Sequence, residues 1–311
     1  MSTSIRRVLG AARRRGAAAL AALRGAPPSP AAEAAREDIA ILDWYSKELP
    51  SAANAVGIFP GEWASRLPAP LEDVPAGSAP LFADPRISWC IERLAAGGRD
   101  GGVRGARVLE LGPLEGGHSY MLETAGAASV TAIESNARSY LKCLVAKELL
   151  GLTRTSFAFG DFVPYLRGCA ERYDVAVASG VIYHLLDPVS VIADLCAVTD
   201  DAIFVWTQYY DEEVIAARSD LHRKFGDRRT ANLDGYDYEL VEYRYLDALD
   251  FAGFCGGSAP TSNWLTRDGL TAAFARHGFA DIEVHDDDRD HVHGPAITFL
   301  ARRSGGVVAG A

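Results

Sequence analysis

From residue 106 onward, hydrophobic residues follow two alternating patterns. Short apolar runs, which are typical of buried strands, are separated by stretches in which apolar residues return every three or four positions, as on one face of a helix. The runs are RVLEL, SVTAIE, SFAFG, DVAVAS and AIFVWT, and the clearest helical stretch covers 137–150. A series of strand, helix and strand predicts a parallel sheet with right-handed crossovers.

The end of the chain has a different pattern. A helical stretch over 267–277 is followed by the apolar runs DIEVH and AITFLARR, which the polar segment DDDRDHVHG separates. Two such runs joined by a short polar link are most simply an antiparallel hairpin. We therefore expect an α/β fold with helices on both faces of a mostly parallel sheet and an antiparallel hairpin at one edge.

Proline and glycine divide the rest of the chain. A helical pattern from residue 33 stops at Pro50, and the segment that follows is dense in proline and glycine but carries apolar anchors such as Phe59 and Trp63. Four segments are expected: a basic leader with a proline-rich linker over 1–32, a helical and irregular N-terminal cap over 33–105, the α/β domain over 106–303, and a flexible tail over 304–311.

The leader carries a concentrated positive charge. It holds six arginines up to Arg24 and no acidic residue before Glu33, and its apolar residues share one helical face opposite most of the arginines. This composition favours a disordered leader, and peripheral contact with an anionic membrane or a partner is the alternative. Its apolar core, 17–23, is too short for a secretory signal, and no apolar run in the chain reaches the roughly 18 residues of a membrane span.

Composition narrows the function classes. The 311-residue chain has a formal net charge of −10, which argues against nucleic-acid binding because Lys and Arg are what neutralise phosphates. Its five cysteines are scattered without metal-ligand spacing, so we expect reduced thiols, a cytoplasmic location and no metal site. The acids and histidines of 286–293 are typical of a solvated hairpin turn. A small-molecule ligand is favoured.

A glycine turn follows the first apolar run. In ELGPLEGG, Gly112 and Gly116 permit a tight turn, and a helix that begins near His118 directs its first N–H groups toward it. Leu114 stands where a dinucleotide site needs a second glycine to admit a pyrophosphate. Glu115 in the turn also disfavours phosphate and suits a cationic ligand.

Three acids end apolar runs and meet at the carboxyl edge of the expected sheet, where open α/β sheets bind ligands. Glu110 lies close to where an ammonium group would sit, and Glu134, 24 residues later, is placed to accept hydrogen bonds from both ribose hydroxyls. Asp161, with Phe162 beside it, fits an adenine amino group and ring. Each acid also has a structural alternative, a cap or salt bridge for Glu110 and a helix cap for the other two. Adenosine without phosphate, joined to a cationic tail, describes S-adenosylmethionine.

These features resemble the class I S-adenosylmethionine-dependent methyltransferases. The resemblance rests on the strand order, the E-L-G-x-x-x-G turn, Glu134, Asp161 and the terminal hairpin, and it covers Arg107 to Arg303. It implies a Rossmann-like three-layer sandwich around a seven-stranded sheet, with S-adenosylmethionine as the cofactor. It also implies a set of cofactor-binding residues: Glu110, Gly112, Pro113, Gly116, Glu134, Asp161, Phe162 and Gly180.

The segment ASGVIYHLLDP follows the fourth run and therefore lies beside the expected position of the transferred methyl group. His184 is the candidate general base, with Tyr183 as a second catalytic residue, because transfer to an alcohol requires removal of a proton. The alternative is that His184 only forms hydrogen bonds around its loop. We expect methyl transfer to oxygen or nitrogen of a small molecule or a glycan.

Two other functions stay open. GVIYHLLDP also resembles a segment of the bacterial tRNA wobble-uridine transferases that use carboxy-S-adenosylmethionine, although that family has two arginines where this chain has Leu185 and Leu186. The second alternative is a non-catalytic scaffold that binds the cofactor, since one fold hosts several functions.

An insertion over 208–266 separates the fifth run from the terminal helix. Insertions at this point lie over the carboxyl edge of the sheet, where they shape substrate pockets. Aromatic rings and an amide of the insertion are the expected acceptor-binding groups: Tyr209, Tyr210, Asn263 and Trp264. The alternative is that these side chains only pack the insertion onto the domain.

Overall fold

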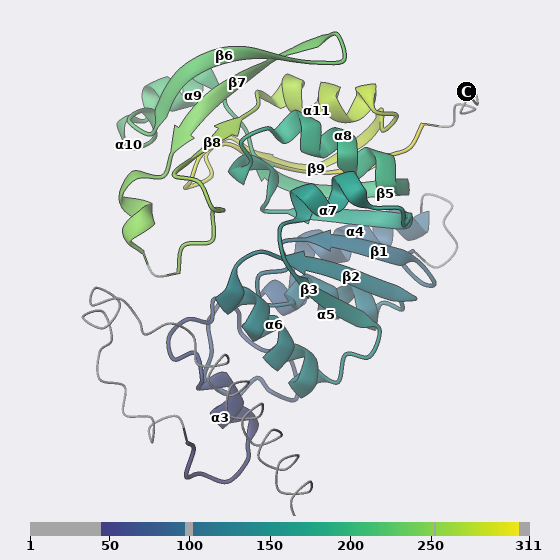
Figure 1. The fold of residues 1–311 in the computed structure, drawn as a ribbon, viewed down its shortest axis with the longest axis vertical. Helices are drawn as coiled ribbons and strands as arrows, with labels where there is room; N and C mark the ends of the chain where they lie inside the picture. The colour runs from purple at the N-terminus through teal and green to yellow at the C-terminus, as the bar shows by residue number, and fades with distance from the viewer. Residues whose placement is uncertain (1–44, 97–101, 252, 305–311) are drawn as a thin grey trace, which may run out of the picture. The chain divides into compact units, whose positions relative to one another are not determined.

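The computed structural model describes residues 45–96, 102–251 and 253–304 (Figure 1). The leader over 1–32, the helical pattern up to residue 44 and the tail after residue 304 lie outside the described residues, so the expectations for them stay predictions. The architecture below is that of the compact unit that begins at Ser51. No described helix combines the length and the apolarity that a membrane span requires.

Seven strands form the central sheet in the order β3-β2-β1-β4-β5-β10-β9. The first five strands in this order are parallel, and β10 pairs antiparallel with both β5 and β9. This arrangement confirms the mostly parallel sheet and the antiparallel C-terminal hairpin. The strands are β1 (Arg107–Leu111), β2 (Ser129–Glu134), β3 (Thr155–Phe159), β4 (Tyr173–Ser179), β5 (Thr199–Gln208), β9 (Asp281–Asp288) and β10 (Ala296–Arg302).

Helices cover both faces of the sheet and so complete the three expected layers (Figure 1). One face packs against α4 (Pro85–Ala96), α5 (Gly117–Thr124) and α6 (Ala137–Leu150). The other face packs against α7 (Phe162–Gly168), α8 (Pro188–Val198) and α11 (Arg267–Arg276).

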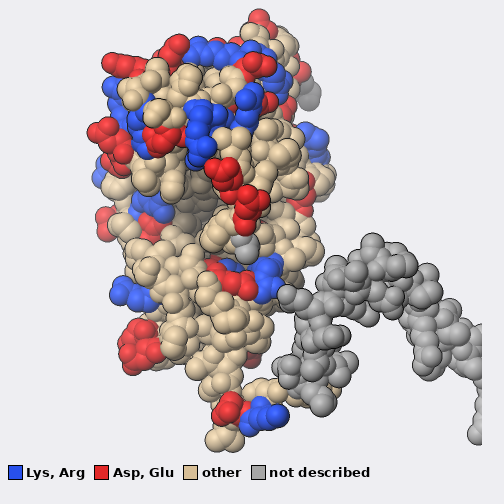
Figure 2. Space-filling view, turned by 90° about the vertical axis from the view of Figure 1, so that its left-hand side faces the viewer, with Lys and Arg blue, Asp and Glu red and all other residues tan. Residues whose placement is uncertain are grey.

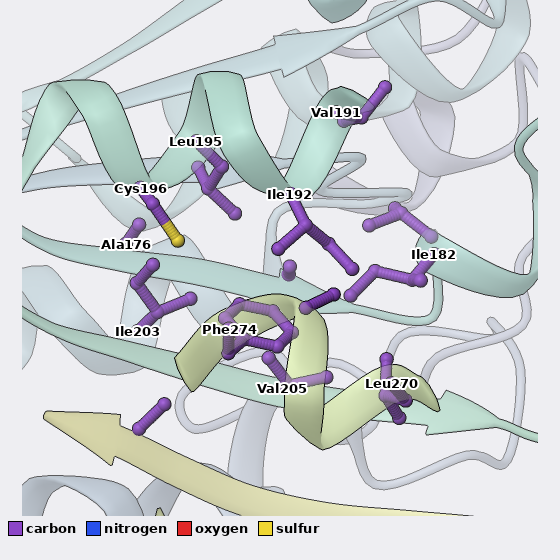
Figure 3. Close-up of a cluster of buried hydrophobic side chains, with 14 of the residues drawn as sticks. Ala176, Ile182, Val191, Ile192, Leu195, Cys196, Ile203, Val205, Leu270 and Phe274 are labelled. Atoms are coloured by element: carbon purple, nitrogen blue, oxygen red, sulfur yellow. The ribbon is translucent and has the colours of Figure 1, made fainter. Parts of the chain in front are cut away.

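Both faces of the central strands are apolar because both are covered by helices. Figure 3 shows the α8 and α11 side, where Ile192 and Leu195 of α8 and Phe274 of α11 gather over Ile203 and Val205 of β5. Burial on two sides explains why these strands appear in the sequence as nearly continuous apolar runs rather than as alternating ones.

The described part of the N-terminal cap packs on the α/β domain. Its regular elements before α4 are α3 (Ala52–Val56) and the 3-10 turn η2 (Leu81–Ala83). Buried apolar side chains from this segment, including Trp63 and Phe82, form one cluster with Ala146 of α6. The irregular chain is therefore held by its anchors and not by a core of its own.

The insertion forms a second, antiparallel sheet of three strands in the order β6-β7-β8. Its hairpin turn, Asp234-Gly235, has positive φ at both residues, 50° and 78°, as a type I′ turn requires. The elements are α9 (Glu212–Ala217), α10 (Ser219–His222), β6 (Phe225–Leu233), β7 (Tyr236–Arg244), η4 (Leu246–Asp250) and β8 (Thr261–Trp264).

Candidate active site

A cavity of about 860 Å³ opens at the carboxyl ends of the parallel strands. Its walls come from the segments that follow β1, β2, β3 and β4, from Trp206 near the end of β5, and from a loop of the insertion. Figure 2 faces this side of the domain and shows a hollow below the charged surface of the insertion. Because parallel strands end at one edge, residues far apart in the sequence meet there.

The glycine turn forms the wall beside β1. Gly112 has a φ of 65°, and a Cβ at this position would lie 2.7 Å from Val181 Cγ1, so the turn has room for glycine alone. Leu114 also has a positive φ, 56°, and its N–H donates to Glu134 Oε2 at 3.0 Å. Pro113 lies between them and lines the cavity as they do.

Glu134 presents an oriented carboxylate to the cavity. Its Oε1 accepts from the Asn136 N–H at 2.8 Å, and its Oε2 accepts from the Leu114 N–H. The residue is 6% exposed, and burial raises the pKa of its carboxyl group while the backbone donors act in the opposite direction. Each oxygen keeps a further lone pair, so two ribose hydroxyls can donate to it as the sequence predicts.

Asp161 and Phe162 line the cavity at the end of β3. Asp161 is exposed and caps α7, because its Oδ1 accepts from the Val163 N–H at 2.8 Å. The helix cap considered as the alternative is therefore present, and the same residue also lines the cavity. Gly180, with a φ of 80°, lines the cavity where β4 ends.

Glu110 and Gly116 are not among the residues that line the cavity. Glu110 is 1% exposed, accepts from the Ser119 hydroxyl, and lies 3.8 Å from His118 Nδ1. Burial raises the pKa of Glu110, and the nearby charge of Glu134 adds to the rise. Gly116 has a φ of 81° and faces the ring of Phe157. Both residues support the turn from behind.

Glu115 does not face the cavity, contrary to the expectation that its charge suits a cationic ligand. It is 1% exposed, and its carboxylate accepts from the N–H groups of Ala64 and Ser65 at 2.9 and 2.8 Å. Lys142 Nζ lies 2.6 Å from Glu115 Oε1 and completes a buried ion pair. Glu115 therefore fastens the N-terminal segment to the turn. Its main partners lie about 50 residues upstream, where sequence reasoning has no means of placing them.

Tyr183 and His184 extend from the 3-10 turn η3 (Ile182–His184) and line the cavity together. Both residues are half-buried, and their ring centroids are 4.0 Å apart. Burial lowers the pKa of His184 to about 4 and raises the pKa of Tyr183. Both side chains are therefore neutral near pH 7, and Tyr183 can donate a hydrogen bond but cannot act as a base there.

Tyr245 determines which nitrogen of His184 carries the proton. Its Oη lies 2.8 Å from the carbonyl oxygen of Gly256 and 2.8 Å from His184 Nδ1. A carbonyl oxygen only accepts, so Tyr245 donates its single proton to Gly256 and accepts from His184 Nδ1–H. In neutral His184 the Nε2 atom is then unprotonated and can take up a proton.

The fold resembles that of a solved structure. The N-terminal domain of EvdMO1, crystallised in the presence of SAH and D-fucose, matches with a TM-score of 0.57 and 22% sequence identity, over 81% of this chain and 95% of that one. The chain has the fold of the class I S-adenosylmethionine-dependent methyltransferases. A structure of EvdMO1 that is not limited to this domain matches with a TM-score of 0.51 and 19% identity, over 81% of this chain and 46% of that one. No protein-family model and no curated protein matches the sequence.

Within the methyltransferase fold, the insertion contributes to the cavity through a loop and not through the residues expected. Tyr209 donates to Asp287 at 2.7 Å, Asn263 Nδ2 donates to the Leu186 carbonyl at 2.7 Å, and Trp264 is 1% exposed. These contacts pack the insertion onto the domain, which was the alternative. None of the four expected acceptor-binding residues lines the cavity: Tyr209, Tyr210, Asn263 and Trp264. The insertion residues that line it are Phe254, Cys255, Gly257, Ser258 and Ala259.

The cavity residues that sequence reasoning missed include Arg86, His118 and Trp206. His118 and Trp206 carried a usable signal, because each stands at the carboxyl edge, one after the glycine turn and the other near the end of β5. Arg86 had none, since it begins a helix before the first strand of the sheet.

No group of three or more His, Cys, Asp or Glu side chains is arranged to hold a metal ion in the part of the chain that the structure describes. In the 286–293 segment, Asp287 instead pairs with Arg267 at 2.6 Å.

Proposed function

We propose that this chain is a methyltransferase that uses S-adenosylmethionine and transfers the methyl group to an oxygen or nitrogen of a small molecule or glycan. One observation carries the proposal: a single cavity joins the glycine turn and Glu134 to Tyr183, His184 and the insertion loop. A cofactor half and an acceptor half therefore share one space, as a direct group transfer requires.

The residues of the cofactor half fit an adenosyl group. Gly112 lets the turn pass close to Val181 at the cavity wall, Glu134 has both oxygens oriented by backbone N–H groups, and Phe162 offers an aromatic ring beside Asp161. Acids line this half, which disfavours a diphosphate and suits a ligand that carries positive charge.

His184 and Tyr183 supply the chemistry of the acceptor half. When bound, S-adenosylmethionine supplies an electrophilic methyl group. His184 Nε2 accepts the proton of an acceptor hydroxyl, and Tyr183 donates a hydrogen bond that helps to orient the acceptor. The imidazolium that forms keeps its Nδ1–H bond to Tyr245. Gly257 of the insertion loop lies beside the His184 backbone and lines the cavity there.

The acceptor class rests on two observations. The cavity volume of about 860 Å³ lies in the upper part of the range of typical ligand pockets, about 300–1,000 Å³, which supports an acceptor bound beside the cofactor. The N-terminal domain of EvdMO1 was crystallised in the presence of SAH and D-fucose, which supports a sugar-like acceptor for a chain of this fold.

The five cysteines are free thiols, which supports the cytoplasmic location.

Calorimetric titration with S-adenosylhomocysteine tests the proposal, with adenosine, NAD and carboxy-S-adenosylmethionine measured in parallel. We expect micromolar binding of the homocysteine compound and a loss of about 1–3 kcal/mol in Glu134→Ala, because the ribose hydroxyls lose a charged acceptor. Absence of binding by the folded parent protein would remove the proposed cofactor. Binding without turnover on any sugar or small-molecule acceptor would favour the scaffold.

A further inference from the structure

Arg86 is a cavity residue whose guanidinium is held in place by two neighbours. Its Nε lies 3.0 Å from Asp84 Oδ1 and its Nη2 lies 2.6 Å from Asp84 Oδ2, so the pair is bidentate. The Arg86 guanidinium carbon also lies 4.6 Å from the ring centroid of Trp206. Arg86 is therefore fixed along one edge by a carboxylate and across one face by an indole.

Asp84 is built to hold this arginine and not to bind ligand. It is 2% exposed, and its Oδ2 is also 3.0 Å from His118 Nε2. Although burial opposes it, hydrogen bonds from His118 and Arg86 keep the pKa of Asp84 well below its usual range. The carboxylate stays ionised, and the position of the guanidinium is set before any ligand arrives.

Only some N–H groups of the Arg86 guanidinium form hydrogen bonds with Asp84. A guanidinium has five N–H donors. Asp84 accepts hydrogen bonds from the Nε–H and from one Nη2–H. The other three N–H donors form no hydrogen bond with the residues that the structure describes. Arg86 lines the cavity, so a ligand there can reach these donors. Planar, preset N–H pairs match the two oxygens of a carboxylate.

We propose that Arg86 binds a carboxylate inside this cavity. The proposal deepens the proposed function and rests on it. Arg86 packs on Trp206 at the β5 end of the sheet edge, whereas the expected adenine residues Asp161 and Phe162 lie at the β3 end. The carboxylate therefore belongs to a part of the cofactor or of the acceptor that lies away from the adenine.

Two sources can supply that carboxylate: the amino-acid tail of the cofactor, or an acidic acceptor such as a sugar acid. Pairs of ligands that differ in the carboxylate distinguish the two sources. S-Adenosylhomocysteine carries the tail and 5′-methylthioadenosine lacks it, while D-glucuronate and D-glucose differ in the same way on the acceptor side. Arg167 provides the matched control, because it also lines the cavity but lies in α7, 3.5 Å from Asp194.

Calorimetry on the full-length parent protein, Arg86→Met and Arg167→Met tests the proposal. If the cofactor supplies the carboxylate, Arg86→Met weakens S-adenosylhomocysteine binding roughly 10- to 100-fold and changes 5′-methylthioadenosine binding less than about twofold. If the acceptor supplies it, both adenosyl ligands bind unchanged, and a preference for glucuronate over glucose in the cofactor-loaded protein is lost in Arg86→Met. Arg167→Met shows neither effect.

The proposal is overturned if Arg86→Met binds S-adenosylhomocysteine as well as the parent does and the parent shows no preference for glucuronate over glucose. It is also overturned if Arg86→Met weakens binding of S-adenosylhomocysteine and of 5′-methylthioadenosine equally. Failure of both adenosyl ligands to bind the parent would instead remove the proposed function. Since Arg86→Met strands the buried Asp84, the double variant Asp84→Asn/Arg86→Met and the variant Arg86→Lys are measured as well. Arg86→Lys keeps the charge but not the fork, so we expect it to lose part of the selectivity for the carboxylate ligand.

Discussion

At the scale of single residues, the site depends on backbone positions with positive φ and on side chains whose protonation the surroundings set. Gly112, Leu114 and Gly180 all have positive φ where strands end. Backbone N–H groups orient the Glu134 carboxylate, burial keeps His184 neutral, and the Gly256 carbonyl fixes the proton of Tyr245. Some of these groups lie far from the residue in the sequence.

Gly112→Ala tests the crowding at the glycine turn, with Gly151→Ala as the control. Both glycines have nearly the same φ, 65° and 66°, but a Cβ at Gly151 would meet nothing within 4 Å. Both variants pay the strain of about 1 kcal/mol for an alanine in left-handed backbone. We expect Gly112→Ala alone to weaken S-adenosylhomocysteine binding, by roughly tenfold or more, because Val181 must move. Equal affinities in the two variants would contradict this account.

The proton arrangement of His184 predicts a role for Tyr245. In Tyr245→Phe the acceptor at His184 Nδ1 is lost, so Nε2–H becomes populated and turnover falls by roughly tenfold while S-adenosylhomocysteine affinity is kept. His184→Ala should lower turnover further. Nitrogen-15 NMR of the imidazole reports the tautomer directly. The control is Tyr243→Phe, because Tyr243 stacks on Trp264 and its hydroxyl accepts from Lys224 rather than from His184. An unchanged tautomer in Tyr245→Phe would refute the assignment.

Burial of His184 also predicts a pH dependence of stability. Its pKa falls from 6.5 to about 4 on folding, so the unfolded state binds more protons between these values. The contribution of neutral His184 is therefore complete above about pH 6.5 and is lost as the pH falls toward 4. Between pH 7 and pH 4.5 the free energy of unfolding should fall in both proteins, and we expect the fall to be smaller in His184→Gln than in the parent by roughly 2 kcal/mol. Urea titrations check this, with the exposed His222→Gln expected to follow the parent.

At the scale of elements, the carboxyl edge of the sheet collects the site, and two segments outside the sheet complete it. The N-terminal segment is joined to the glycine turn through Glu115, and the insertion delivers Tyr245 and the loop at 253–259. Asn136 Nδ2 lies 3.5 Å from the Phe254 carbonyl oxygen, so this loop also reaches the segment after β2.

Glu115→Ala tests the attachment of the N-terminal segment. The change leaves the buried Lys142 ammonium and two backbone N–H groups without their acceptor, which should lower the free energy of unfolding by about 3–5 kcal/mol. The matched control is Glu62→Ala, which breaks the more exposed pair with Arg138 and should cost less than about 1 kcal/mol. Urea denaturation measures both. If both variants lose a similar free energy of unfolding, Glu115 does not fasten the N-terminal segment to the turn.

At the scale of the whole molecule, charge separates the proposed function from the tRNA alternative. The net charge is −10, and Lys and Arg on the face in Figure 2 are interspersed with Asp and Glu, so no unbroken basic surface lies there. We expect no tRNA binding at about 0.15 M salt, because phosphate contacts supply most of such affinity. Gel-shift titration with bulk tRNA checks this. Salt-sensitive binding near the micromolar range would instead favour the tRNA-modifying alternative.

The sequence by itself determined the architecture of the sheet and the edge of the sheet at which the proposed cofactor half lies. Strands buried on two faces leave continuous apolar runs, and their ends place Gly112, Glu134 and Asp161 at one edge whatever the details of packing. Only the tertiary structure decided the rest. Arg86, the inward turn of Glu115 and the Tyr245 bond to His184 depend on contacts between segments 30 to 60 residues apart or more, which no local pattern records. The insertion aromatics illustrate the same limit, because a buried ring and a ligand-binding ring leave identical traces in a sequence.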